Sequence, residues 1–146
     1  MSEQPIQHFI FYMAATPEKV WEGLISPESN RILFMGAELK ADLSPGGRMD
    51  WVGPDKEGKP TTYVGGKVLQ ADPPKLLQYT FAMGGSEKES RVTVELVPET
   101  EATKVSVTHD GFAPDDPMYA AILDGWPRIL SRLKTLLETG KTFRPH

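Results

Sequence analysis

Histidine is the side chain best suited to acid–base chemistry near neutral pH, and this chain has three: His8, His109 and His146. His109 ends the run Val105-Ser106-Val107-Thr108-His109, in which the odd positions carry the valines. Because successive strand residues face opposite sides, His109 is predicted to point toward the core together with them. We favour a core histidine that is hydrogen-bonded to a neighbour, or a strand-end residue that reaches water. A ligand-binding or catalytic role is the alternative.

Several aromatic side chains fall on predicted strands or on the last predicted helix. Side chains of this kind can line an apolar pocket, with Trp N–H and Tyr O–H groups as polar contacts for a ligand. For any single one of them, plain core packing is the other interpretation. Together with His109, the candidate ligand-binding residues are Trp51, Tyr63, Tyr79, Phe81 and Trp126.

No motif in the chain indicates a specific catalytic or metal-binding chemistry. The absence of cysteine excludes thiol catalysis and disulfides, and the histidines lack metal-ligand spacing. The Gly-Gly pairs at 46–47, 65–66 and 84–85 match no phosphate-binding loop, so turns and a bend explain them. His109 and Asp110 are strand neighbours, so their side chains point to opposite faces and cannot form a dyad. We therefore expect no metal site and no cofactor, and no catalytic residue is identified.

The strongest periodic pattern lies between Met118 and Thr139, where apolar residues recur at steps of three and four, as on one wide helical face. Pro127 would break a helix interior, so the sequence predicts a main helix from about Gly125 to Thr139 with Asp124 as its N-cap. A shorter helical turn would precede it and meet it at a kink near Leu123–Asp124. The side predicted to face water carries Arg128, Ser131, Arg132, Lys134, Thr135 and Glu138.

The rest of the chain reads mainly as strands. Residues 6–14 form the first, and two short helices follow, one starting at Thr16-Pro17 and one over 29–35. Strands with hairpin-length turns are then predicted over residues 38–43, 48–52, 61–71, 76–83, 89–97 and 104–110. This order indicates an α+β fold, with an antiparallel sheet of about seven strands that curves around the last helix. Gly65-Gly66, in mid-strand, is predicted to mark a bulge or a sharp bend.

Length and charge limit the classes of partner. With 146 residues, the chain is expected to form a single domain over 1–146, with a mobile tail at 141–146. A net charge of −4 with scattered Lys and Arg argues against nucleic acid. Because no apolar run approaches the length of a membrane span and no signal-peptide pattern opens the chain, we expect no membrane partner and a cytoplasmic protein.

Four segments together resemble a known family: Thr16 to Trp21, Ser44 to Met49, Gly66 to Leu76, and Gly125-Trp126 with the leucines that follow. Their order and sequence are similar to those of the START-like (SRPBCC) superfamily, in the branch named after the activator of heat-shock-protein-ninety ATPase. This resemblance implies a helix-grip fold, in which a curved sheet grips the C-terminal helix and leaves a cavity between them. Functions diverge widely within the superfamily, so the fold alone does not determine the activity.

Three functions follow as hypotheses. The first is a binding protein that holds an apolar or amphipathic small molecule under the C-terminal helix. The second is an enzyme of the cyclase or hydrolase type that uses the same cavity, with His109 as acid or base. The third, implied by the resemblance, is a co-chaperone that stimulates a chaperone ATPase; it is weakened because the chain lacks the additional N-terminal domain of the eukaryotic activators. The sequence leaves the oligomeric state open.

Overall fold

The computed structural model describes residues 2–34, 36–84, 86 and 88–143, and its elements follow the predicted order. One strand and two short helices precede a run of strands and a long C-terminal helix. The elements are β1 (Gln7–Met13), α1 (Pro17–Ile25), α2 (Pro27–Leu33), β2 (Glu38–Ala41), β3 (Arg48–Pro54), β4 (Pro60–Asp72), β5 (Leu76–Met83), β6 (Ser90–Glu99), β7 (Ala102–Asp110) and α3 (Tyr119–Thr139).

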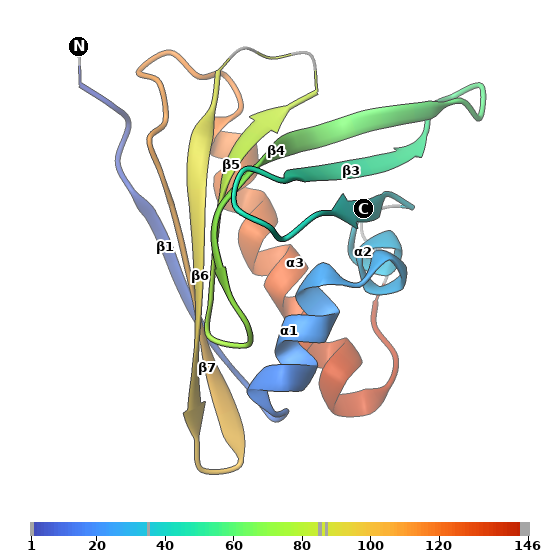
Figure 1. Cartoon of the computed structure of the whole chain (residues 1–146), viewed down its shortest axis with the longest axis vertical. Helices are drawn as coiled ribbons and strands as arrows, with labels where there is room; N and C mark the ends of the chain where they lie inside the picture. The colour runs from blue at the N-terminus through green and yellow to red at the C-terminus, as the bar shows by residue number, and fades with distance from the viewer. Residues whose placement is uncertain (1, 35, 85, 87, 144–146) are drawn as a thin grey trace.

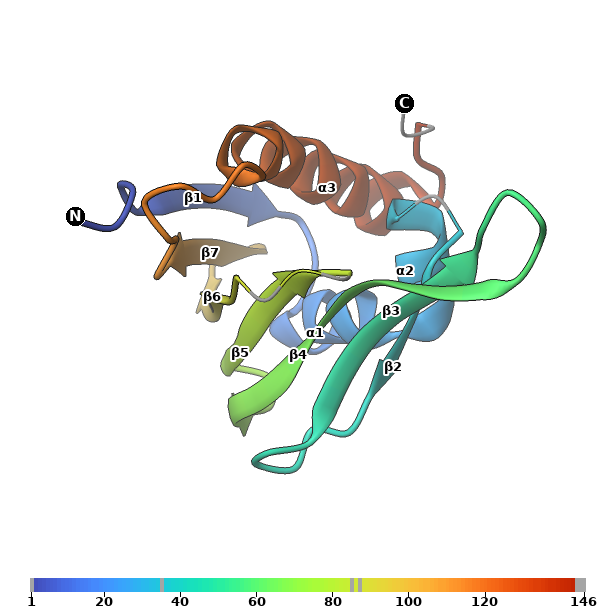
Figure 2. The same cartoon turned by 90° about the horizontal axis from the view of Figure 1, so that it is seen from above.

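All neighbouring strands pair antiparallel in one sheet of order β1-β7-β6-β5-β4-β3-β2. The sheet curves strongly, and all three helices lie on its concave side (Figure 1). Seen from above, the sheet bends around α1 and α2 while α3 crosses the opening (Figure 2). This is the predicted helix-grip fold, so the fold class is confirmed.

Side-chain caps begin both short helices. The Thr16 hydroxyl accepts from the backbone N–H of Lys19, and the Ser26 hydroxyl accepts from that of Ser29. Proline occupies the first turn in each case, where a missing N–H costs nothing. Ser26 is therefore both the C-cap of α1 and the N-cap of α2. The second helix begins two residues earlier than the predicted 29–35, and residue 35 lies outside the described residues.

Of the bulge or sharp bend predicted at Gly65-Gly66, the bulge is not present there, because the register shifts lie on either side of the pair. One shift lies in the pairing of β3 with β4, at Trp51/Val52, and the other lies in the pairing of β4 with β5, between Val68 and Gln70. The pair serves a different purpose: a Cβ on Gly66 would sit 1.8 Å from the carbonyl oxygen of Thr80 on β5. Only a residue without a side chain lets the two backbones approach this closely.

Helix α3 is longer than predicted and unbroken at Leu123–Asp124. It starts after Met118 without a side-chain cap, and Pro127 lies inside it. Asp124 is not the N-cap; its carboxylate pairs with Arg128 one turn later. The cost of an interior proline is outweighed by burial, since Trp126, Leu130 and Leu133 of this helix are 7%, 0% and 0% exposed.

Side chains of α3 also cover the free edge of β1. The Lys134 ammonium donates to the carbonyl of Tyr12, and the Glu138 carboxylate accepts from the N–H of Ala14. These bonds occupy backbone groups that an edge strand would otherwise offer to another chain. They also hold α3 in a fixed position along the sheet.

The C-terminal segment that follows Gly140 is predicted from the sequence to be a mobile tail. Its residues Thr142 and Phe143 contact Arg132, and residues 144–146 lie outside the described residues.

Glycine positions provide a direct test of this packing. Gly66→Ala should lower the free energy of unfolding by about 3 kcal/mol, because the new methyl group would overlap the Thr80 carbonyl. Gly125→Ala, in α3, is the matched control: nothing lies within 4 Å of its Cβ position, so better helix propensity should raise stability by about 1 kcal/mol. Urea denaturation measures both. Equal effects of the two substitutions would contradict the close approach of β4 and β5.

Candidate functional site

An apolar pocket of about 190 Å³ lies between the concave face of the sheet and the N-terminal half of α3. Most of its wall is aliphatic or aromatic, so it would exclude a strongly polar ligand. An outer groove of about 610 Å³ adjoins it and shares six lining residues with it. The shared residues are Phe34, Trp51, Val64, Met83, Gly125 and Ile129.

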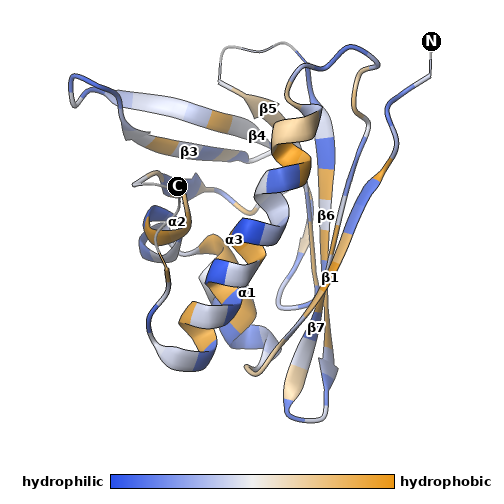
Figure 3. Ribbon diagram, turned by 180° about the vertical axis from the view of Figure 1, so that it is seen from behind, coloured by the Kyte–Doolittle hydropathy of each residue, from blue (hydrophilic) through white to orange (hydrophobic). Residues whose placement is uncertain are grey.

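Helix α3 contributes to this region through a second stripe beside its packing stripe. Trp126, Leu130 and Leu133 are buried in the core, as the apolar periodicity predicts. Met118, Ile122, Gly125 and Ile129 line the pocket at steps of three and four, and Arg132 continues this stripe into the groove. Hydrophobic and hydrophilic residues alternate along α3 in Figure 3, in agreement with a helix that has only part of its surface in the core.

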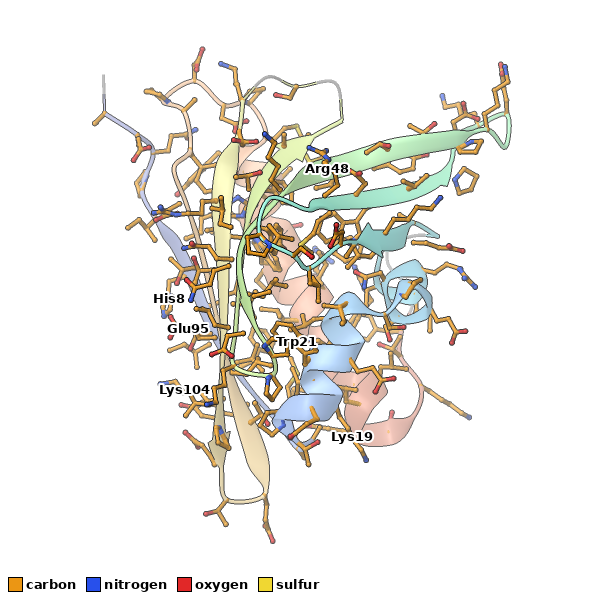
Figure 4. The ribbon with its side chains drawn as sticks, viewed as in Figure 1. His8, Lys19, Trp21, Arg48, Glu95 and Lys104 are labelled. Atoms are coloured by element: carbon orange, nitrogen blue, oxygen red, sulfur yellow. The ribbon has the colours of Figure 1, made fainter. Side chains whose placement is uncertain are left out.

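The structure brings four of the candidate residues to one place. Trp51, Tyr79, Phe81 and Trp126 all line the inner pocket, and Tyr63 lines the outer groove. His109 is fully buried, as its strand alternation predicts, but it does not line the pocket. It lies behind Phe81 and Trp126, with ring centroids 4.9 Å and 6.1 Å away. His8 lies on the outer face of the sheet and bonds to the Thr108 hydroxyl (Figure 4).

A chain of hydrogen bonds through His109 joins α3 to three strands. The indole N–H of Trp126 donates to Nδ1 of His109 at 2.9 Å, and Nε2 of His109 lies 2.6 Å from the hydroxyl of Ser90. The Ser90 hydroxyl in turn donates to the carbonyl of Phe81 at 3.3 Å. The contacts therefore run from α3 through β7 and β6 to β5. Sequence reasoning did not identify Ser90, since a serine at a strand start carries no signal by itself.

These partners determine the tautomer of His109. An indole N–H can only donate, so Nδ1 must be the acceptor and the proton must lie on Nε2. Burial lowers the pKa of His109 to about 4, against an opposing effect of the Asp110 charge. With its Nε2 already protonated, His109 cannot take the proton of Ser90, and the pair is not an activated nucleophile. The geometry matches the hydrogen-bonded core histidine rather than an acid or base.

Asp110, as predicted, points away from His109 and forms no dyad with it. Both of its carboxylate oxygens accept from Arg91, at 3.0 Å and 2.7 Å. No group of three or more potential metal ligands gathers in the described part of the chain. Within the same residues, no helix is long and apolar enough to cross a bilayer.

Of the polar groups in the pocket wall, the two indoles are already satisfied. Trp51 donates to the amide oxygen of Asn30 at 2.9 Å, and the Asn30 NH₂ group bonds to the carbonyls of Leu24 and Ser26. The Tyr79 hydroxyl has no hydrogen-bond partner among the described residues, and burial raises its pKa, so it stays neutral. A ligand in the pocket would therefore find one neutral hydroxyl to bond with.

The structure corrects the prediction that Arg132 faces water, because its side chain is 6% exposed. Leu123, counted in the apolar pattern, is 42% exposed instead. Arg132 is buried because α2 and the C-terminal segment cover its flank of α3. The Arg132 guanidinium donates to the Leu33 carbonyl and lies under the Phe143 ring. No helical periodicity could reveal this, since the covering elements are distant in sequence.

The sequence model of the family described as "Activator of Hsp90 ATPase homolog 1-like protein" matches residues 14–138. The chain belongs to this activator of Hsp90 ATPase homolog 1-like family. The match spans most of the chain, from the end of β1 to the last turn of α3, so all walls of the pocket lie within the family region. No curated protein matches the sequence significantly.

Several solved structures share this fold. The solution structure of ChR145 from Cytophaga hutchinsonii is 26% identical, with a TM-score of 0.76, and the match covers 96% of this chain and 98% of that one. The Aha1 dimer from Colwellia psychrerythraea is 19% identical, with a TM-score of 0.74 over 94% and 99% of the two chains. PFC0360w, an HSP90 activator from Plasmodium falciparum, is 17% identical, with a TM-score of 0.74 over 91% and 96%. The last two show the shared fold alone.

The lowered pKa of His109 predicts how the stability of the protein depends on pH. The pKa is about 4 in the folded protein and 6.5 as an ordinary value, so the unfolded chain binds the proton more tightly. Stability should be fully present above pH 6.5 and fall as the pH drops, by about 2 kcal/mol between pH 7 and pH 5.

His109→Gln is the control, because its amide can still accept from Trp126 and donate to Ser90 but does not titrate. Urea denaturation of both proteins at pH 7 and pH 5 should give a clearly smaller pH effect for the variant. The same loss of stability in both proteins would show that His109 is not held neutral.

Proposed function

We propose that the protein is a cytoplasmic binding protein for an apolar or amphipathic small molecule, held in the pocket between the sheet and α3. The observation that carries the proposal is an open apolar pocket of about 190 Å³ between the sheet and α3. Engineered apolar cavities of about 150 Å³ bind benzene, so this one has room for an aromatic ring or a short aliphatic chain. The adjoining groove would take the rest of a longer ligand.

Gly125 supports the same proposal. Glycine inside a helix costs about 1 kcal/mol relative to alanine. At position 125 no neighbour lies within 4 Å of a Cβ, and no positive φ demands glycine. The residue lines both the pocket and the groove, so its absent side chain enlarges the space that a ligand would occupy.

The enzyme hypothesis finds less support in the geometry. His109 stands behind the pocket wall with both ring nitrogens engaged. The neutral Tyr79 hydroxyl can orient a ligand but is a weak acid or base at neutral pH. The co-chaperone hypothesis is supported by the family description alone. Stimulation of an Hsp90-type ATPase by the purified protein, unaffected by a variant that fills the pocket, would favour it.

Filling the pocket tests the binding proposal. Gly125→Leu should lower the affinity for N-phenyl-1-naphthylamine, a neutral fluorescent apolar probe, by about tenfold or more, because the new side chain occupies the space of the ligand. Ala120→Leu is the matched control, since Ala120 is an exposed position of α3 outside the pocket wall.

Both substitutions replace a small helical residue by leucine, so helix stability should be maintained in each. Fluorescence titration measures the affinities, and circular dichroism verifies the fold. Equal probe binding by wild type, Gly125→Leu and Ala120→Leu would contradict a binding site in the pocket.

A further inference from the structure

Arg132 is a buried cation that forms no ion pair with a carboxylate of the described residues; its guanidinium lies against the Phe143 ring. It is 6% exposed, and no Asp or Glu carboxylate of the described residues lies within 4.0 Å of its guanidinium. One terminal nitrogen donates to the Leu33 carbonyl at 3.0 Å, while Nε is buried without an acceptor. A buried charge without a counter-charge destabilises the fold, so its presence suggests an acceptor that arrives from outside the chain.

The outer groove around Arg132 has a positive charge, although the chain as a whole carries −4. Its charged lining residues are Lys56, Arg128, Arg132 and one acid, Asp55. The Asp55 carboxylate already accepts from two backbone N–H groups of its own turn, at 2.8 Å each. Arg128 pairs with Asp124 at the exposed rim. The groove thus attracts anions, with the most deeply buried cation at its base.

Apolar and cationic parts of the site follow one another along α3. Ile122 lines only the inner pocket, Gly125 and Ile129 line both spaces, and Arg132 lines only the groove. At a helical rise of 1.5 Å per residue, Ile122 and Arg132 are about 15 Å apart along the helix axis. A ligand lying along α3 would therefore have its apolar body at one end and an anionic group at the other.

We propose that the ligand is an amphipathic carboxylate, whose apolar body fills the inner pocket and whose carboxylate group binds the Arg132 guanidinium in the outer groove. The planar guanidinium can match a carboxylate with two parallel hydrogen bonds. Arg128 and Lys56 add attraction at the rim. This inference rests on the proposed binding function and specifies the class of its ligand.

A set of three ligands with the same chain and different head groups tests the inference on the wild-type protein. Decanoate, decan-1-ol and decylamine are each titrated, below the concentration at which they aggregate, against bound N-phenyl-1-naphthylamine at pH 7.5. Decanoate should displace the probe at about tenfold lower concentration than decan-1-ol, since a hydrogen-bonded ion pair adds to the same apolar contacts. Decylamine should be the weakest of the three.

Substitution of Arg132 identifies the group responsible. Arg132→Gln should bring decanoate to the affinity of decan-1-ol while the affinity for decan-1-ol stays unchanged. Lys104→Gln is the control for loss of one positive charge, because Lys104 points outward from the far side of the sheet (Figure 4). Should Arg132→Gln fail to fold, the double variant Lys56→Gln, Arg128→Gln removes two exposed cations and should weaken decanoate about threefold.

The outcomes separate this inference from the proposed function. Equal affinities for decanoate and decan-1-ol, or no effect of Arg132→Gln on decanoate, would overturn the assignment of an anionic ligand and leave small-molecule binding in place. If the probe does not bind, or no ligand of the three displaces it, both proposals are overturned. Preference for decanoate in wild type and its loss in Arg132→Gln is the result we expect.

Discussion

The hydrogen bond from the Trp126 indole to His109 holds the long helix at a defined distance from the sheet, and the pocket depends on that distance. It forms in a fully buried setting where His109 also stacks on Phe112, with ring centroids 4.4 Å apart. A hydrogen bond at such a site costs far more to break than it would at the surface, because an unpaired indole or imidazole would remain in an apolar medium. The helix is thereby fixed at Trp126, which belongs to the packed stripe and also lines the pocket.

The space beside Trp126 is left open by the same geometry. Trp51 is held on the opposite wall by Asn30, and its ring contacts Tyr79 and Phe34 at centroid distances of 5.7 Å and 5.8 Å. Because both indoles are bound to buried partners, neither can swing into the space between them. The rigid walls and the missing side chain of Gly125 together account for a pocket that the surrounding core does not collapse to fill.

Much of the fold could be predicted from the sequence because its patterns are local. Alternation along the strands, Thr16-Pro17 and Ser26-Pro27 at helix starts, and the steps of three and four in α3 each reflect backbone geometry over a few residues. Pro127 misled the prediction because its local cost is smaller than the burial gained by an unbroken helix. The alternation argument placed His109 in the core correctly, yet it could not show that Trp126 and Phe81 stand between it and the pocket.

The remaining features of the site depend on contacts between distant segments. Ser90 and Asn30 are ordinary polar residues until the sheet and the α1–α2 junction bring them to His109 and Trp51. Arg132 falls on the helix side that the sequence pattern predicts to face solvent, yet α2 and Phe143 cover it. Such groups carry information about binding, since an interior polar group needs a partner, but their burial becomes visible only in three dimensions.

The most direct test of a ligand site between the sheet and α3 is a methyl NMR titration of the isotope-labelled protein with decanoate. We expect shifts concentrated on Val64, Met83, Ile122 and Ile129, which line the pocket. The methyl groups of Val105 and Val107, fully buried in the core outside the pocket wall, should remain unchanged. Shifts confined to residues outside the pocket, or none at concentrations that saturate the probe assay, would contradict the account.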